Sequence, residues 1–204
     1  MRAPETFPSA VADTARVLAS ADLTALVVGE LATALLAREP AEWRPSELDL
    51  FLRPEDADAA ADLLEERGFA SADPEGPWCR MVTRPGVRVV LRSRLPGDVY
   101  VDEEMAARAI PTEFEGVNLL LIPAEDLAVV KALAHGEDRP AEWWDALAIV
   151  GRSDLDWTYL RARARQYGVH RVLSLLFHAR SLGTAVPDQV LGELFDFLEE
   201  RRQT

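Results

Sequence analysis

The stretch LVVGELATALLA (residues 26–37), followed by RPSELDLFLRP (residues 44–54), decides the fold class of this chain. The apolar run at residues 23–28 ends at Gly29 and has the composition of a buried strand, and the residues after the glycine are good helix formers. Residues 47–52 alternate polar and apolar side chains, which is typical of a strand with one covered face. Together the two segments predict a strand, a tight turn, a helix and a second strand.

Glycine and proline mark the boundaries of the elements that follow. Gly68 closes a long helical stretch, and the RPG sequence at residues 84–86 separates two β-rich runs, which predicts a hairpin. From Pro123 onward every strong pattern has helical period. The sequence therefore predicts an α/β (α+β) fold, with a mixed sheet flanked by helices in residues 1–122 and a helical C-terminal bundle in residues 123–204. The expected strands lie at 23–28, 47–52, 78–83, 87–92 and 117–122, and the expected helices at 9–20, 30–38, 54–67, 102–109, 124–135, 141–151, 156–167, 170–182 and 187–202.

Composition and charge exclude several classes of protein. The chain has 204 residues and a formal net charge of -13, which repels a polyphosphate backbone and argues against a general nucleic-acid binder. No stretch approaches the ~20 apolar residues that cross a bilayer, so a cytoplasmic protein without membrane contact is expected. Cys79 is the single cysteine, which leaves neither a disulfide nor a thiolate metal cage; it is expected to be a small buried side chain.

The excess acid lies in the first 150 residues, because residues 151–204 hold eight Lys and Arg against seven Asp and Glu. Five arginines and no acid occur between Leu160 and Pro187. They form either a local patch for an anion or ordinary solvated helix faces. These arginines are Arg161, Arg163, Arg165, Arg171 and Arg180.

The residues best suited to chemistry are Glu47 and Asp49. Two acids at positions i and i+2 of a strand project from the same face. Carboxylate oxygens can hold Mg²⁺ or Mn²⁺, which neutralises phosphate charge during phosphoryl transfer. The pair indicates either such a metal site or an exposed strand face whose alternate residues, Leu48 and Leu50, point into the core.

Four segments, in order, resemble the DNA polymerase β-like nucleotidyltransferase superfamily, in particular its small uncharacterised bacterial branches and its abortive-infection toxin group. LVVGELATALLA (26–37) resembles the first strand, glycine turn and helix of that family, and RPSELDLFLRPEDADAAADLLEERGF (44–69) resembles its acidic-pair strand and the next helix. GVRVVLRSRLP (86–96) resembles the strand that usually bears a third metal-binding aspartate. PAEDLAVVKALAHGEDRPAEWWDALAI (123–149) resembles a helical motif with a lysine, an arginine and a terminal aspartate. The resemblance implies a nucleotidyltransferase-like α/β domain in residues 1–122.

The resemblance also implies roles for individual residues. Glu47 and Asp49 take the places of the catalytic and metal-binding acids, and Gly29 that of the phosphate-loop glycine. Lys131 and Arg139 match the basic residues that would bind the NTP, and Asp145 matches the terminal aspartate of the helical motif. The implied cofactors are Mg²⁺ or Mn²⁺, with an NTP as substrate.

Three positions depart from the family pattern. Glu30 follows the glycine where a second glycine or a serine is usual, and its carboxylate would repel a triphosphate. Glu47 replaces the commoner aspartate. Val90 stands where the third aspartate is expected, and a valine can neither ligate a cation nor take a proton. Nearby acids either supply a substitute or form a solvated acidic loop: Asp98, Asp102, Glu103 and Glu104.

The helical region leaves several alternatives open. Lys131 either reaches a phosphate or lies at the surface of its helix. Trp143 and Trp144 are expected to be packing residues that join the helical part to the sheet, with base stacking as the alternative. The three histidines share no metal-ligand spacing, and ordinary structural roles suffice for them.

Three functions remain as hypotheses. The first is a Mg²⁺-dependent transferase that moves a nucleotidyl group from an NTP to an unknown acceptor, such as a small molecule, a protein or an RNA end. The second is a catalytically inactive descendant of the fold that acts as a binding or regulatory module. The third is a toxin or antitoxin-like protein that modifies transfer RNA, against which the net charge weighs.

Overall fold

The computed structural model describes residues 7–37, 46–74, 76–136 and 140–202. These residues fall into two compact units. The first comprises the described parts of Met1–Ala34, Pro40–Leu95 and Tyr100–Ile122, and the second comprises those of Leu35–Glu39, Pro96–Val99 and Pro123–Thr204. From Pro123 onward, the described residues all belong to the second unit.

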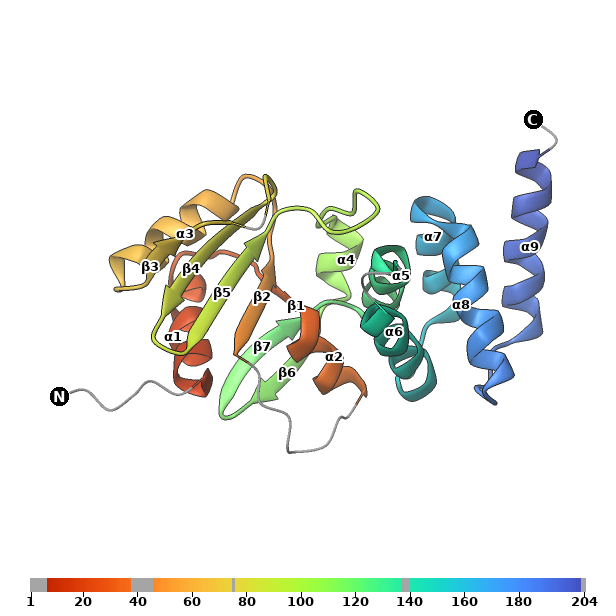
Figure 1. Cartoon of the computed structure of the whole chain (residues 1–204), viewed down its shortest axis with the longest axis horizontal. Coiled ribbons are helices and arrows are strands. Elements are labelled where there is room, and N and C mark those ends of the chain that lie inside the picture. Colours follow the sequence, from red (N-terminus) through yellow and green to blue (C-terminus); the bar gives the residue numbers. More distant parts are fainter. Residues whose placement is uncertain (1–6, 38–45, 75, 137–139, 203–204) are drawn as a thin grey trace. The chain divides into compact units, whose positions relative to one another are not determined.

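A mixed sheet forms the centre of the first unit (Figure 1). Its strands are β1 (Leu26–Val28), β2 (Glu47–Phe51), β3 (Ala70–Ala72), β4 (Cys79–Arg84), β5 (Val87–Arg92), β6 (Ile110–Phe114) and β7 (Val117–Leu121). Among the described residues the order of the seven strands is β3-β4-β5-β2-β1-β7-β6. Strand β2 pairs antiparallel with β1 and parallel with β5, so it lies near the middle of the sheet. This central place buries most of β2 and leaves its amino end, at Glu47, half-exposed.

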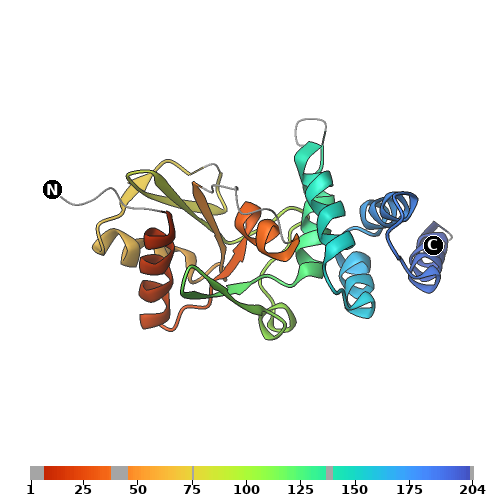
Figure 2. The same ribbon diagram turned by 90° about the horizontal axis from the view of Figure 1, so that it is seen from below.

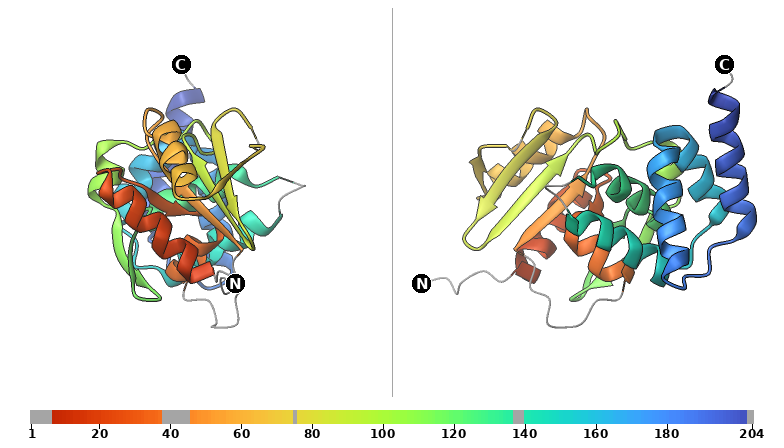
Figure 3. Two further views of the ribbon diagram at one scale, coloured as in Figure 1. Left: turned by 90° about the vertical axis from the view of Figure 1, so that its left-hand side faces the viewer. Right: turned by 45° about the vertical axis from the view of Figure 1, so that its right-hand side comes forward.

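Two amphipathic helices cover one face of this sheet. Helix α1 (Phe7–Ser20) packs on β7, and α3 (Ala57–Glu66) packs on β4 and β5. Figure 2 and the left panel of Figure 3 show the two helices side by side on that face. Because strand residues alternate, Leu48 and Leu50 of β2 point toward the helices, and Glu47 and Asp49 point to the opposite face.

The first unit also contains two shorter helices, α2 (Gly29–Ala37), which continues into the second unit, and α4 (Glu103–Ala107). Helix α2 begins directly at the end of β1. In α4 the side chain of Asp102 caps the amino end by accepting a hydrogen bond from the backbone N–H of Met105 at 2.8 Å. Asp102 therefore has a structural task in this loop.

The second unit is helical and is organised around α5 (Ala124–Ala134), which contacts α6 (Pro140–Arg152), α7 (Trp157–Tyr167) and α8 (Val169–Ser181). The last helix, α9 (Asp188–Arg202), packs on α7 and α8. Asp126 of α5 is 1% exposed and accepts hydrogen bonds from Tyr159 Oη at 2.6 Å and Arg163 Nε at 2.5 Å. This buried carboxylate therefore joins α5 to α7. No helix in the described ranges is long and apolar enough to span a membrane.

The structure confirms the expected fold class and corrects several details. The helices expected after Pro123 are present within one or two residues of their expected ends. Strands β3 and β6 were not expected. Strand β6 contains Pro111, which cannot donate to a ladder, and this is tolerated because β6 lies at the edge of the sheet. Cys79, expected to be buried, is only half-buried.

Candidate functional site

Gly29 lies at the turn between β1 and α2 and has a φ of +66°. A Cβ built on this residue would lie 2.4 Å from Asp49 Oδ2 and 3.0 Å from Asp49 Cβ. The turn therefore requires glycine for two reasons: its backbone is left-handed, and the side chain of Asp49 leaves no room for a Cβ. The residue expected to serve as the phosphate-loop glycine is in direct contact with the expected metal ligand.

Glu47 and Asp49 emerge on the same face of β2, beside this turn. The antiparallel register pairs Asp49 with Val28, the residue that precedes the glycine. Asp49 is buried, and Glu47, at the start of the strand, is half-buried. The structure thus brings together the three residues Gly29, Glu47 and Asp49, as the strand-turn-strand pattern predicts.

Two arginines of β5 are ion-paired with these acids. Arg92 Nε donates to Asp49 Oδ1 at 2.7 Å, and the Asp49 side chain is 10% exposed. Arg88 Nη2 lies 2.8 Å from Glu47 Oε2. The parallel register between β2 and β5 aligns Glu47 with Arg88, so alternate residues of β5 face the acids. The two negative charges of the pair are therefore balanced by two positive charges on the neighbouring strand.

Val90 lies between these arginines on β5, and the register places it directly opposite Asp49. It is fully buried. No group of three or more His, Cys, Asp or Glu residues among the described residues could hold a metal ion. Two carboxylates, each paired with a guanidinium and flanked by a valine, do not fit the donor set that Mg²⁺ requires, because the ion needs oxygen ligands that are free to coordinate it.

Three other acids, Glu30, Asp102 and Glu104, form no metal-binding group with the pair among the described residues. Glu30 is exposed and lies in the first turn of α2, the helix that begins at Gly29. Asp102 caps α4, and Glu104 of that helix is ion-paired with Arg108. The structure thus assigns structural partners to two of the acids that were considered as substitutes for a third metal ligand.

Lys131 is buried inside the second unit, which excludes the alternative that it lies at the surface of its helix. Its Nζ donates to Asp145 Oδ2 at 2.7 Å and to Glu142 Oε2 at 2.8 Å, both on α6. Burial alone would lower the pKa of Lys131, but the hydrogen bonds and the charges of Asp145 and Glu142 outweigh burial and raise this pKa. Asp145, expected as the terminal aspartate of the helical motif, is thus a partner of the motif lysine. Arg139 lies outside the described residues, and its role stays a prediction.

Four of the five arginines between Leu160 and Pro187 have acidic or carbonyl partners. These contacts join helices of the second unit, so the four arginines do not form an open patch for an anion. Arg163 binds the buried Asp126, Arg161 is ion-paired with Glu193, Arg165 donates to the backbone carbonyl of Glu193, and Arg180 is ion-paired with Asp188.

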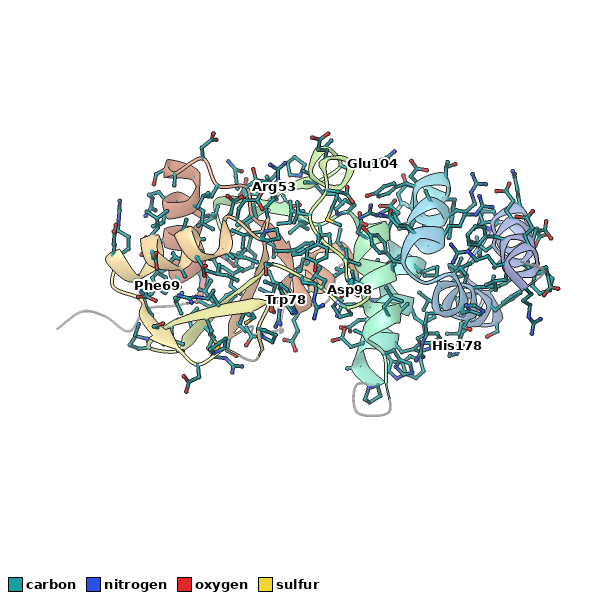
Figure 4. The ribbon with its side chains drawn as sticks, turned by 90° about the horizontal axis from the view of Figure 1, so that it is seen from above. Arg53, Phe69, Trp78, Asp98, Glu104 and His178 are labelled. Carbon is teal, nitrogen blue, oxygen red and sulfur yellow. The ribbon has the colours of Figure 1, made fainter. Side chains whose placement is uncertain are left out.

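An aromatic cluster that was not anticipated joins α6 to α8. Trp143 Nε1 donates to His178 Nδ1 at 2.9 Å, and the ring of Trp143 lies 4.9 Å from that of His135. His178, labelled in Figure 4, also contacts the ring of Trp144. Trp144 is 61% exposed and so is not a packing residue, whereas Trp143 is half-buried among residues of the second unit. Trp143 and His178 are 35 positions apart in sequence, so no local sequence pattern could predict their hydrogen bond.

The fold and the site define a class of protein: a mixed sheet in which a strand, a glycine turn and an acidic-pair strand lie together, followed by helices. Solved structures with this fold include the lincosamide antibiotic adenylyltransferase LnuA with lincomycin bound, at a TM-score of 0.51 and 11% identity over 71% of this chain and 96% of that one. The antibiotic-resistance factor ANT(2'')-Ia in complex with adenylyl-2''-tobramycin matches at a TM-score of 0.51 and 11% identity over 85% of this chain and 96% of that one. An antigenic nucleotidyltransferase-like protein from Paracoccidioides brasiliensis matches at 0.50 and 17% identity over 85% and 94%.

In sequence, residues 10–182 match the model of the family described as "Uncharacterised nucleotidyltransferase". The chain belongs to this nucleotidyltransferase family. No curated protein matches it in sequence. The resemblance to nucleotidyltransferases is thereby confirmed, and membership of the abortive-infection branch stays a prediction.

Proposed function

We infer that this chain acts as a non-catalytic binding or regulatory module built on the nucleotidyltransferase fold. The supporting observation is that Asp49 and Glu47 are each ion-paired with an arginine of β5. A metal ion at this position would have to displace both guanidinium groups. It would also place the positive charges of Arg88 and Arg92 beside the cation, where like charges repel.

The register of the sheet supports the same proposal. Val90, opposite Asp49, replaces the third carboxylate with an apolar and fully buried side chain. Glu30 adds a negative charge after the glycine turn, where a triphosphate would approach. Charge and donor set therefore both disfavour a metal-bound nucleotide at this site.

The alternative is nucleotidyl transfer from an NTP, supported by family membership and by the contact of Asp49 with Gly29. In that alternative Glu47 and Asp49 would be the catalytic acids, and Arg88 and Arg92 would have to leave them. Because LnuA is a lincosamide adenylyltransferase and ANT(2'')-Ia was solved with adenylyl-2''-tobramycin, small-molecule acceptors are the first to test.

Metal binding is the first test. Titration calorimetry with Mn²⁺ should give no saturable heat for the wild-type chain. The Arg88→Gln/Arg92→Gln variant removes the guanidinium groups beside both acids, and we expect its Mn²⁺ affinity to rise at least about tenfold because two positive charges that repel the cation leave the site. Arg16→Gln/Arg80→Gln is the matched control, since it removes two exposed arginines that are paired with Asp13 and Asp58 elsewhere in the same unit. Equal Mn²⁺ affinities for the two double variants would contradict the proposed role of the arginines.

Turnover is the second test. The wild-type chain is incubated with labelled ATP or GTP, with Mg²⁺ or Mn²⁺, and with lincomycin, tobramycin or RNA as acceptor. The module proposal expects no transfer of label. Transfer by the wild-type chain that Asp49→Asn abolishes would overturn this proposal and establish the transferase alternative.

A further inference from the structure

Helices α8 and α9 of the second unit form an antiparallel hairpin through the connection at residues 182–187. Figures 1 and 3 show the two helices side by side. Each carries a large aromatic side chain that is open to solvent, since Phe177 of α8 and Phe195 of α9 are both 50% exposed. Exposed aromatic side chains that share a surface mark a place where another molecule binds.

The two phenylalanines lie on the same surface of this hairpin. An ion pair between Arg180 of α8 and Asp188 of α9 sets the alignment of the helices. Phe177 lies three residues before Arg180, and Phe195 lies two turns after Asp188, so both rings are on the side where the helices meet. Counted from the ion pair, Phe177 is level with Leu191, and Phe195 is about one turn further along the hairpin. We call this outer surface the α8/α9 face.

Gly192 lies on the α8/α9 face, between Asp188 and Phe195 on the same side of α9. It is exposed in the interior of the helix, and a Cβ built on it meets no atom of the described residues within 4 Å. Its φ is not in the left-handed region, so the backbone does not require glycine either. Glycine inside a helix is less stable than alanine, and one reason for its use is the close approach of another chain.

The charges of the two helices are complementary. Helix α8 contains two arginines, two histidines and no acidic residue, whereas α9 contains five acidic residues and two arginines. Arg171 of α8 and Asp196 of α9 are both exposed, and within the described part of the chain neither has a hydrogen-bond or ion-pair partner. Counted from the ion pair at Arg180, Arg171 is level with Phe197, the residue after Asp196. The hairpin thus carries an unpaired cation and an unpaired anion at almost the same level.

We propose that the α8/α9 face binds a second copy of this chain and that the protein forms a two-fold symmetric dimer. A two-fold axis parallel to the hairpin keeps the levels of the helices and places α8 of each copy on α9 of the other. Phe177 then packs over Gly192 of the second copy, and Arg171 pairs with Asp196 of the second copy. Both contacts occur twice, because such an interface uses the same surface of each copy.

The size of the α8/α9 face predicts a reversible dimer. The helices have 13 and 15 residues, so the hairpin is about 20 Å long and about 20 Å wide and offers a footprint of about 400 Å² per copy. This footprint is at the low end for a specific interface, and we expect a dissociation constant in the micromolar range. The face contains none of the residues around the acid pair, so this inference does not rest on the proposed function.

Sedimentation equilibrium of the full chain tests for the dimer at concentrations from about 1 to about 300 μM. We expect the mean mass to rise with concentration from 22.6 kDa toward twice that value. A mass of one chain at every concentration would overturn the proposal and leave the α8/α9 face to a partner other than this chain.

Phe177→Ser should raise the dissociation constant at least about tenfold, because an apolar ring leaves each half of the interface. Leu120→Ser is the control, since Leu120 is an exposed apolar residue of β7 in the first unit, 38% exposed, and should leave the dimer unchanged. Equal weakening by the two variants would show that association does not use the α8/α9 face.

Gly192→Gln tests the close approach of the second copy. Glutamine is a better helix former than glycine, so the melting temperature of the monomer should not fall. The longer side chain occupies the space above the helix, and the dissociation constant should rise at least about tenfold. A dimer of unchanged affinity in this variant would place the contact elsewhere and overturn the inference.

Two charge reversals test the pairing between copies. In a homodimer of Arg171→Asp two acids face each other, and in a homodimer of Asp196→Arg two arginines do, so each variant alone should stay monomeric where wild type dimerises. An equimolar mixture restores both opposite-charge pairs, and its mass should rise to that of two chains. A mixture that stays monomeric would contradict the proposed pairing, because contacts within one chain cannot be rescued by another.

Discussion

Gly29→Ala should lower the free energy of unfolding by about 3 kcal/mol, the combined cost of a left-handed alanine and of a steric clash. The new Cβ would lie 2.4 Å from Asp49 Oδ2, and the Asp49 Cβ at 3.0 Å leaves the carboxylate no room to step back. Asp49 would therefore have to move, which would also break its 2.7 Å hydrogen bond from Arg92. Urea denaturation followed by circular dichroism measures the loss.

Gly86→Ala is the matched control for this prediction. Gly86 has a similar positive φ of +82°, but a Cβ there meets no atom within 4 Å. Its substitution should cost only about 1 kcal/mol, the backbone part of the effect. Equal losses at the two glycines would show that the contact with Asp49 contributes nothing, and would contradict the geometry of the site.

Lys131→Met should lower the free energy of unfolding by about 2–3 kcal/mol, because it leaves two carboxylates without their cation. The Lys131 side chain is 6% exposed, and those of Glu142 and Asp145 are 30% and 33% exposed. Once the buried ammonium is removed, the two half-buried acids of α6 repel each other. Urea denaturation at neutral pH checks the size of the loss.

The same ion pairs predict the direction of a pH effect. The pKa of Lys131 is raised in the folded protein above its ordinary value of 10.5. Its contribution to stability is therefore fully present below that ordinary value and is lost as the pH rises through the folded pKa. The difference in unfolding free energy between wild type and Lys131→Met should be constant from pH 7 to 9 and should shrink above pH 10.5.

The control for Lys131 is the triple variant Lys131→Met/Glu142→Gln/Asp145→Asn. It replaces all three charged groups by neutral ones of similar size, so it should recover part of the lost stability. A triple variant no more stable than Lys131→Met would show that the loss comes from packing of the lysine stem instead of from unpaired charge.

Much of the fold could be predicted from local sequence. The apolar run before Gly29, the alternation at residues 47–52 and the helical period after Pro123 each depend on neighbours within a few positions, where periodicity is informative. The edge strand β6 could not be recognised in this way. Pro111 argues against a strand, and only the place of β6 at the border of the sheet removes the objection.

The candidate site was predictable only in part. Glu47 and Asp49 share a face because strand residues alternate. Gly29 was expected to lie close to them because it ends the strand that precedes theirs in the chain. Arg88 and Arg92 can also be read from the sequence GVRVVLRSRLP (86–96). Whether they face the acids depends on the register between β2 and β5, and a shift by one residue would turn them to the other face.

The sequence by itself determined the order of strand, glycine turn and acidic pair, and the helical end of the chain, because these follow from local periods and backbone preferences. The tertiary structure alone decided which charges meet. Arg88 and Arg92 neutralise the acid pair, and Lys131 is held by Glu142 and Asp145, through contacts between residues eleven or more positions apart. Electrostatic partners are set by distances in space, and those distances exist only once the sheet and the helices have packed.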